Sequence, residues 1–213
     1  MNYHFKALLQ NDGWLSPAFV STDVNGSITD ISNQPKDHIQ YEEVAGYALP
    51  GFQNAHSHAF QYAMAGIAET HQTGDVADDF WSWREAMYKV ALTISPDQLE
   101  AIATMLYSEM VKHGYTQVAE FHYLHHDKEG KPYDNLAEMG ERLVSAAQTA
   151  GIKITLVPMF YQKGGFGIAP QSHQRRFISS TVEDYHKLLE ATKKVVAPHS
   201  HANYGFGIHS LRA

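Results

Sequence analysis

From about residue 47 onward, the sequence alternates strand-like apolar segments with amphipathic helical ones, and this alternation restricts the possible folds more than any other feature. The strand-like segments are one ending at 54–58 and others at 115–121, 152–160 and 205–209, and the helical segments are 95–114, 135–150 and one that opens at Thr181. The segment 152–160 is almost continuously apolar, which is typical of a parallel strand buried on both faces. Strands that alternate with helices predict a parallel sheet with crossover helices.

The first of these helices carries a capping signal. Ser95 is a favourable N-cap, Pro96 suits the first helical position, and Gln98 stands three residues after the cap, as in a capping box. Apolar side chains then recur with the helical period as far as Met110, and Gly114 is suited to end the helix. The pattern therefore predicts a helix followed at once by a strand.

The predicted fold class is α/β, and the number of strands indicates half of an eight-stranded barrel. Four strands within residues 49–213 match the first half of a TIM-like (β/α)8 barrel. A doubly wound open sheet is the competing architecture, although no Gly-x-Gly-x-x-Gly follows a strand to support a nucleotide-binding version of it. Residues 1–48 read as short strands and turns, with a hairpin around Asn25-Gly26. We therefore predict a small β-rich segment, 1–48, followed by a barrel half, 49–213.

Composition excludes several classes of protein. The net charge of −7 argues against non-specific nucleic-acid binding, which needs clustered Lys and Arg. No apolar run of about 18 residues is present, so we expect no membrane span, and the N-terminus lacks the order of a signal peptide. The chain has no cysteine, which excludes disulfides and Cys-ligated zinc. Any transition metal would need His, Asp or Glu ligands, and the chain has 14 histidines.

Polar and aromatic side chains gather where each predicted strand ends. In α/β barrels, the carboxyl ends of the strands form the active-site face. The four strand ends are Asn54-Ala55-His56-Ser57-His58, Glu120-Phe121-His122-Tyr123, Phe160-Tyr161-Gln162 and His209-Ser210-Leu211-Arg212. One such ending would mean little, whereas four together predict a site at this face.

The pair His56 and His58 has the spacing of metal ligands. Side chains two residues apart on a strand point to the same face, where two neutral imidazoles can bind one divalent metal, typically zinc. The alternative is a pair of histidines that only make hydrogen bonds. His199 and His201 have the same spacing but follow Pro198 between a helix and a strand, so we interpret that second pair as part of a solvated loop.

The remaining polar clusters receive simpler interpretations. We expect His125 and His126 to be exposed loop histidines, and Arg175-Arg176 to be a solvated surface pair. The histidines without supporting context are His71, His173 and His186. The segment Trp81-Ser82-Trp83-Arg84 permits two interpretations, which are ordinary packing and an anion-binding wall.

Taken together, the motifs resemble the amidohydrolase superfamily and, within it, the formimidoylglutamate deiminases of histidine degradation. The segments that carry the resemblance are Leu49-Pro50-Gly51, His56-Ser57-His58-Ala59-Phe60-Gln61, Phe80-Trp81-Ser82-Trp83-Arg84, Glu120-Phe121-His122-Tyr123-Leu124-His125-His126 and His209-Ser210-Leu211-Arg212-Ala213. The His-Ser-His segment is shared across the superfamily, while the segments that begin at Phe80 and Glu120 are more specific to the deiminases. The resemblance spans nearly the whole chain but only the N-terminal half of the family's length.

The resemblance implies a metal site and a substrate site. His56 and His58 match the first two metal ligands of the family, for which we expect one Zn²⁺ or another divalent ion. The positions that match substrate-binding residues are Gln61, Arg84, Tyr123, His209 and Arg212. The family substrate, N-formimidoyl-L-glutamate, carries two carboxylates, and the fork of an arginine suits a carboxylate. The resemblance therefore favours a binding role for the Trp-Arg segment.

The implied reaction is hydrolysis at an amidine carbon, in which N-formimidoyl-L-glutamate and water give N-formyl-L-glutamate and ammonia. Bound zinc would lower the pKa of its water toward neutrality. In the family, the other metal ligands, the general-base glutamate and a second catalytic histidine belong to later strands. We therefore assign no catalytic residue, and neither His199 nor Asp184 is taken as a substitute.

The end of the sequence at Ala213 leads to further expectations. We expect a truncated chain whose half barrel leaves strand edges and apolar surface uncovered, so that it is poorly soluble or oligomeric alone. Segment 1–48 would be part of a composite β-sandwich that lacks its other strands. For the full-length parent we expect a cytoplasmic homodimer that binds a small-molecule dicarboxylate, with no nucleic-acid or membrane partner. Two alternatives stay open, a related deaminase of a ring amidine and a non-catalytic remnant.

Overall fold

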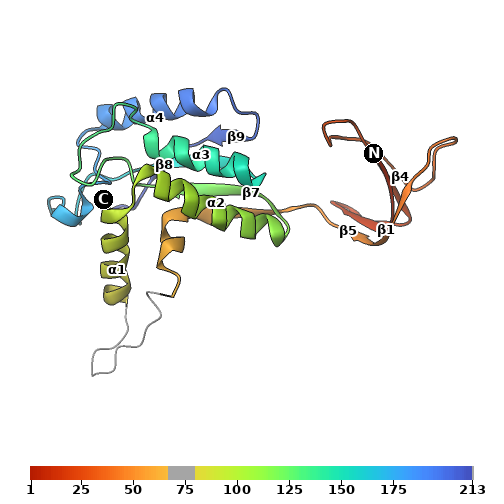
Figure 1. The fold of residues 1–213 in the computed structure, drawn as a ribbon, viewed down its shortest axis with the longest axis horizontal. Coiled ribbons are helices and arrows are strands. Elements are labelled where there is room, and N and C mark those ends of the chain that lie inside the picture. The colour runs from red at the N-terminus through yellow and green to blue at the C-terminus, as the bar shows by residue number, and fades with distance from the viewer. Residues whose placement is uncertain (67–79, 213) are drawn as a thin grey trace, which may run out of the picture. The chain divides into compact units, whose positions relative to one another are not determined.

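The structure, a computed structural model, describes residues 1–66 and 80–212, without the side chains of residues 80–82. His71 lies outside the described residues, as do the side chains of Trp81 and Ser82. The chain divides into two compact units, Met1–Gly51 and Phe52–Ala213, both of which are drawn in Figure 1. In the described part of the chain, no helix is long and apolar enough to cross a membrane.

The N-terminal unit is a five-stranded sheet. Its strands are β1 (Asn2–Gln10), β2 (Gly13–Leu15), β3 (Ala18–Thr22), β4 (Ile28–Ser32) and β5 (Glu42–Ala48). The central strand β1 pairs with β2 and β3 antiparallel and with β5 parallel. Strands β3 and β4 form the predicted hairpin, and Gly26 in its turn has a φ of +83°, a conformation that glycine adopts without strain.

The second unit contains a parallel sheet whose strands follow chain order. Its strands are β6 (Phe52–Ser57), β7 (Tyr115–His122), β8 (Lys153–Phe160), β9 (Ala202–Tyr204) and β10 (Gly207–Ile208). Strand β7 lies between β6 and β8, and both β9 and β10 pair with β8, all in parallel. A doubly wound sheet reverses its order partway, whereas a barrel does not. The sheet therefore matches the first part of an α/β barrel, as predicted.

Helices connect these strands and cover the sheet (Figure 1). They are η1 (Ala59–Met64), α1 (Phe80–Thr93), α2 (Pro96–Lys112), α3 (Glu138–Ala150), η2 (Ser172–Gln174) and α4 (Val182–Val196). Helix α2 packs on α3, α3 packs on α4, and each of these three helices contacts the strand that follows it. Their apolar faces and the outer face of the sheet form one core, which includes Leu99, Leu143 and Leu156.

The helix ends follow the sequence signals closely, with one shift and one omission. Ser95 and Gln98 form the predicted capping box at the start of α2. Helix α3 begins three residues after the predicted start, because the side chain of Asn135 accepts a hydrogen bond from Ala137 N at 3.0 Å and holds a turn there. Helix α1 was not among the predicted elements, although its buried Met87, Tyr88 and Ala91 have helical spacing.

The fourth strand differs from the prediction, because the single strand expected at 205–209 is two short strands, β9 and β10. The hydroxyl of Tyr185 lies at the interruption, where it donates to Pro158 O at 2.8 Å and accepts from Gly207 N at 3.2 Å. Pro158 has no N–H to offer a neighbouring strand. A side chain thus replaces part of the backbone ladder, which sequence periodicity does not reveal.

Candidate active site

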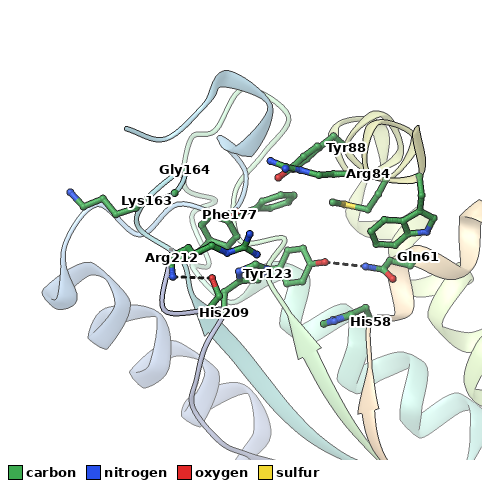
Figure 2. A pocket seen from close by; sticks show the side chains of 15 residues that line it. His58, Gln61, Arg84, Tyr88, Tyr123, Lys163, Gly164, Phe177, His209 and Arg212 are labelled. Carbon is green, nitrogen blue, oxygen red and sulfur yellow. Dashed lines mark hydrogen bonds between the residues drawn. The ribbon is translucent and has the colours of Figure 1, made fainter. Parts of the chain in front are cut away.

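A cavity of about 330 Å³ lies at the carboxyl ends of the parallel strands (Figure 2). Six of the seven residues assigned to the site from the sequence line it: His58, Gln61, Arg84, Tyr123, His209 and Arg212. The seventh, His56, contacts His58 beside the cavity. Residues up to 154 positions apart in the chain therefore share one cavity, from His58 to Arg212.

The two histidines of the His-Ser-His segment converge through their ring nitrogens. Their Nε2 atoms are 3.1 Å apart. The side chain of Asn54 accepts a hydrogen bond from His56 N at 3.1 Å, and the ring of Phe121 stacks on the ring of His56 at 4.7 Å between centroids. Both imidazoles are thus placed by neighbours on β6 and β7.

The ring of His58 has a defined tautomer. Its Nδ1 lies 2.5 Å from Phe121 O, a carbonyl that can only accept, so Nδ1 carries the hydrogen and Nε2 keeps its lone pair. Burial lowers the pKa of His58, and the nearby His56 lowers it further, against the effect of the Phe121 hydrogen bond. A neutral imidazole with a free Nε2, oriented through its other nitrogen, is the form in which histidine binds zinc.

The separation of the two Nε2 atoms fits a shared metal ion. Two nitrogens bound to one tetrahedral zinc lie about 3.3 Å apart when each Zn–N bond is about 2.05 Å. The observed 3.1 Å is close to this distance. Within residues 1–66 and 80–212, no group of three or more His, Asp or Glu side chains is arranged to hold a metal. The described chain therefore brings two imidazoles together, one group fewer than the three protein ligands usual for catalytic zinc.

Tyr123 at the end of β7 presents a hydroxyl to the cavity. Gln61 Nε2 donates to this hydroxyl at 3.0 Å, so the oxygen already serves as an acceptor and its proton can be donated to a ligand. Burial raises the pKa of Tyr123, which keeps that proton in place. Tyr123 is therefore suited to be a neutral hydrogen-bond donor.

Helix α1 forms one wall of the cavity with Trp83 and Arg84. The guanidinium carbon of Arg84 lies 5.5 Å from the centre of the Tyr88 ring, one helical turn further along. This geometry is a cation–π contact, which favours a defined position for the guanidinium. Tyr88 itself lines the cavity, and the sequence analysis did not identify it although it follows Arg84 at the i+4 spacing.

His209 and Arg212 follow β10 and lie on another side of the cavity from Arg84 (Figure 2). The ring of His209 packs on Tyr161 at 4.3 Å and on Tyr123 at 5.5 Å between centroids. Burial lowers the pKa of His209 to about 4, with smaller contributions from His58 and Arg212. His209 is therefore neutral near pH 7.

The charge of the cavity wall has one sign. Among the described residues that line it, Arg84, Lys163 and Arg212 are cationic and none carries a carboxyl group. Lys163 belongs to the loop after β8 and was not identified from the sequence. This wall suits an anion, and the described lining contains no carboxylate that would serve as a general base.

Two interpretations from the sequence are wrong. His125, expected to be exposed, is 2% exposed, and its Nε2 donates to Met159 O at 3.0 Å. Arg176, expected on the surface, is 0% exposed, and its guanidinium donates to Ala91 O, Ile94 O and His126 O. Backbone carbonyls distant in sequence accept from both buried side chains, although His125 Nδ1 has no partner among the described residues.

The second His-Ser-His pair lies in a turn between α4 and β9, as expected, but its rings are half-buried. His201 Nε2 lies 3.3 Å from Val144 O, and the two rings are 5.3 Å apart between centroids. This pair contributes nothing to the cavity lining.

Comparison with known proteins agrees with this geometry. A formimidoylglutamate deiminase from Pseudomonas aeruginosa is 45% identical over 212 residues, which are 98% of this chain and 45% of that protein. The crystal structure of an amidohydrolase from Brucella melitensis matches with a TM-score of 0.91 and 45% identity, over 100% of this chain and 46% of that one. An adenosine deaminase from Xanthomonas campestris, solved with bound zinc, has a TM-score of 0.66 at 14% identity, over 97% of this chain and 42% of that one, and so shows a shared fold.

The chain spans about half the length of these relatives. The model of the Amidohydrolase family matches residues 47–203, which include both histidines of the first strand and the strands and helices from β6 to α4, while β10, His209 and Arg212 lie beyond the match. From its sheet order, its cavity at the strand ends and this match, the chain belongs to the amidohydrolase family.

Proposed function

We propose that this chain supplies the first two metal ligands and the carboxylate-binding wall of a hydrolase that converts N-formimidoyl-L-glutamate and water to N-formyl-L-glutamate and ammonia. The observation that carries the proposal is the cationic cavity next to His56 and His58, in a chain 45% identical to a formimidoylglutamate deiminase. A substrate with two carboxylates matches a wall with two arginines on different sides.

Each residue has a proposed task. His56 and His58 hold a divalent ion, for which zinc is the first candidate, and bound zinc supplies a Lewis acid and a water of lowered pKa. Arg84 and Arg212 bind the two carboxylates. Tyr123 donates a neutral hydrogen bond, and Gln61 orients its hydroxyl.

Proton transfer is assigned to no described residue, because none that lines the cavity carries a carboxyl group. A cytoplasmic location and a homodimer stay predictions. A ring-amidine deaminase is disfavoured by the cationic wall, since a neutral base has no need of three cations.

Calorimetric binding to the zinc-loaded chain tests the substrate class. N-formimidoyl-L-glutamate is compared with 4-formimidamidobutanoate, which lacks the α-carboxylate. Because a hydrogen bond to a charged group contributes about 1.5–3 kcal/mol, the analogue should bind roughly ten to a hundred times more weakly. Equal binding of the two ligands, or tighter binding of a neutral nucleobase, would overturn the proposal.

Activity is tested in a chimera in which this chain replaces the matching 45% of the Pseudomonas aeruginosa relative. Ammonia release from N-formimidoyl-L-glutamate is expected, with loss of activity in the His56→Ala chimera. A folded, zinc-replete chimera that releases no ammonia would contradict the proposed reaction.

A further inference from the structure

Glu120 is a buried acid close to the site, and the proposed reaction gives it no task. It lies on β7, where alternate residues Val118, Glu120 and His122 are buried beneath the helices. Its side chain is 1% exposed and does not line the cavity. A carboxylate is costly to bury without partners, so its surroundings indicate what it does.

The main partner of Glu120 is the backbone just after His58. Glu120 Oε1 accepts a hydrogen bond from Ala59 N at 2.6 Å. Burial raises the pKa of this carboxyl to about 7, while the Ala59 hydrogen bond and the nearby hydroxyls of Ser57 and Tyr107 favour its charged form. The other oxygen, Oε2, makes no hydrogen bond among the described residues. The carboxylate is therefore directed at the turn that carries His58.

Backbone pairing alone leaves this turn loosely specified. The register of β6 against β7 shifts between Asn54 and Ser57, which is the stretch that contains His56. Beyond Ser57, β6 ends, and His58 precedes η1 without any side-chain cap on that helix. Across the turn, Gln61 N donates to His58 O at 3.0 Å, and hydrogen bonds that involve side chains supply the remaining anchors.

Two consecutive residues of β7 supply these anchors in different ways. The side-chain carboxylate of Glu120, on the helix side, accepts from Ala59 N. Phe121 contributes its backbone carbonyl, which accepts from His58 Nδ1, and its ring, which stacks on His56. Without the Glu120 carboxylate, Ala59 N would lose its side-chain acceptor, and without the Phe121 contacts, the rings of His56 and His58 would lose their support.

We propose that Glu120 is a positioning residue that fixes the His56-Ser57-His58 turn, so that the two Nε2 atoms converge on a metal. The inference rests on the proposed metal-binding role of these histidines. Mutation of a group that orients metal ligands without binding the metal itself typically lowers metal affinity by about 10–100-fold.

Two substitutions of Glu120 test whether the length of its side chain or its negative charge is needed. Glu120→Asp keeps the charge but withdraws the carboxylate by one carbon, about 1.5 Å, and so loses Ala59 N. Glu120→Gln keeps an oxygen at the same reach but loses the charge. If positioning is the role, Glu120→Asp should weaken zinc binding at least tenfold, and Glu120→Gln should stay within about threefold of the wild type. A purely electrostatic role predicts the reverse order.

Zinc affinity is measured in the 213-residue chain by competition with a chromophoric chelator, with circular dichroism to confirm folding. Glu138→Gln is the matched control, because Glu138 is a partly buried acid on α3 that pairs with Arg142 at 2.9 Å. The control should bind zinc like the wild type.

A second readout needs no metal. ¹⁵N NMR of the His58 ring should show hydrogen on Nδ1 in the wild type and in Glu120→Gln, and a mixture of tautomers in Glu120→Asp. If the wild type binds no zinc, the metal proposal fails, while this readout still decides the role of Glu120. The inference would be overturned if both folded variants had the zinc affinity and the His58 tautomer of the wild type. It would also be overturned if Glu120→Gln weakened zinc binding more than tenfold.

Discussion

The buried guanidinium of Arg176 allows a quantitative test of how the second unit is held together. Its Nε donates to His126 O at 2.8 Å, and one terminal nitrogen donates to Ala91 O at 2.5 Å and to Ile94 O at 2.8 Å. These oxygens belong to the C-terminal end of α1 and to the loop after β7. Arg176 thus connects the helix that carries Arg84 to the loop after β7, which begins at Tyr123.

The expected cost of Arg176→Met follows from two opposing terms. The three hydrogen bonds to backbone carbonyls contribute about 1.5–3 kcal/mol each, or roughly 4–9 kcal/mol in all. The longer contacts with Tyr133 Oη at 3.4 Å and Met139 Sδ at 3.9 Å are left out of this sum. Against this loss, the methionine variant no longer buries a charge, and the desolvation of that charge costs the wild type several kcal/mol. Methionine fills much of the volume, so we expect the free energy of unfolding to fall by about 3 kcal/mol.

Urea unfolding followed by circular dichroism measures this change, and the adjacent arginine is the control. Arg175 is half-exposed, and it donates to Lys128 O at 2.6 Å and to Ser172 O at 3.0 Å. Arg175→Met should therefore cost less than about 1 kcal/mol. If the two variants differ by less than about 0.5 kcal/mol, Arg176 is not the anchor described here.

Three further predictions concern the site, pH and helix capping. Arg84→Met and Arg212→Met should each weaken N-formimidoyl-L-glutamate binding about tenfold or more, measured by calorimetry, with little effect on a neutral amidine. Burial lowers the pKa of His122 from 6.5 to about 3. As the pH decreases below 6.5, the unfolded state therefore binds a proton that the folded state does not, and the free energy of unfolding decreases, by about 2 kcal/mol at pH 5. His122→Leu should flatten that fall in urea titrations at several pH values; an unchanged slope would contradict the assignment. Ser95→Ala removes the capping box of α2 and should lower stability by about 1 kcal/mol, measured as a lower urea midpoint.

The parts of the fold that were predictable depend on local chemistry. Ser95 caps α2 through Gln98, which is only three residues away, and the apolar run 152–160 has the composition of a buried strand and forms β8. Convergence of the site was also predictable, because parallel strands bring their carboxyl ends to one edge. His58 and Arg212 therefore share a cavity although the chain between them is long.

What escaped prediction depends on partners that are remote in sequence. Arg176 meets carbonyls 82 and 85 residues away, and nothing near Arg175-Arg176 distinguishes the buried side chain from its half-exposed neighbour. His125 donates to Met159 O, 34 residues away. A polar side chain can be buried when the folded chain places a backbone carbonyl within hydrogen-bond distance of it. A single sequence carries little information about which carbonyl will lie there.

The segment Glu120-Phe121-His122-Tyr123, at the end of β7, shows why a contiguous motif can indicate function more strongly than a histidine pair. Tyr123 faces the cavity, whereas Glu120 and His122 are buried beneath the helices. Phe121 holds both metal-type histidines through its carbonyl and its ring. Neighbouring side chains of this run therefore serve different faces of the strand. His199-Ser200-His201 has the same spacing as His56-Ser57-His58, but its ring centroids lie 5.3 Å apart against 4.7 Å in the first pair. The neighbouring strand β8 bonds to the backbone of this pair, from Ile154 N to His201 O at 2.9 Å, and not to a ring. The convergence of His56 and His58 is thus set by Phe121 on the neighbouring strand as much as by the spacing of the histidines themselves.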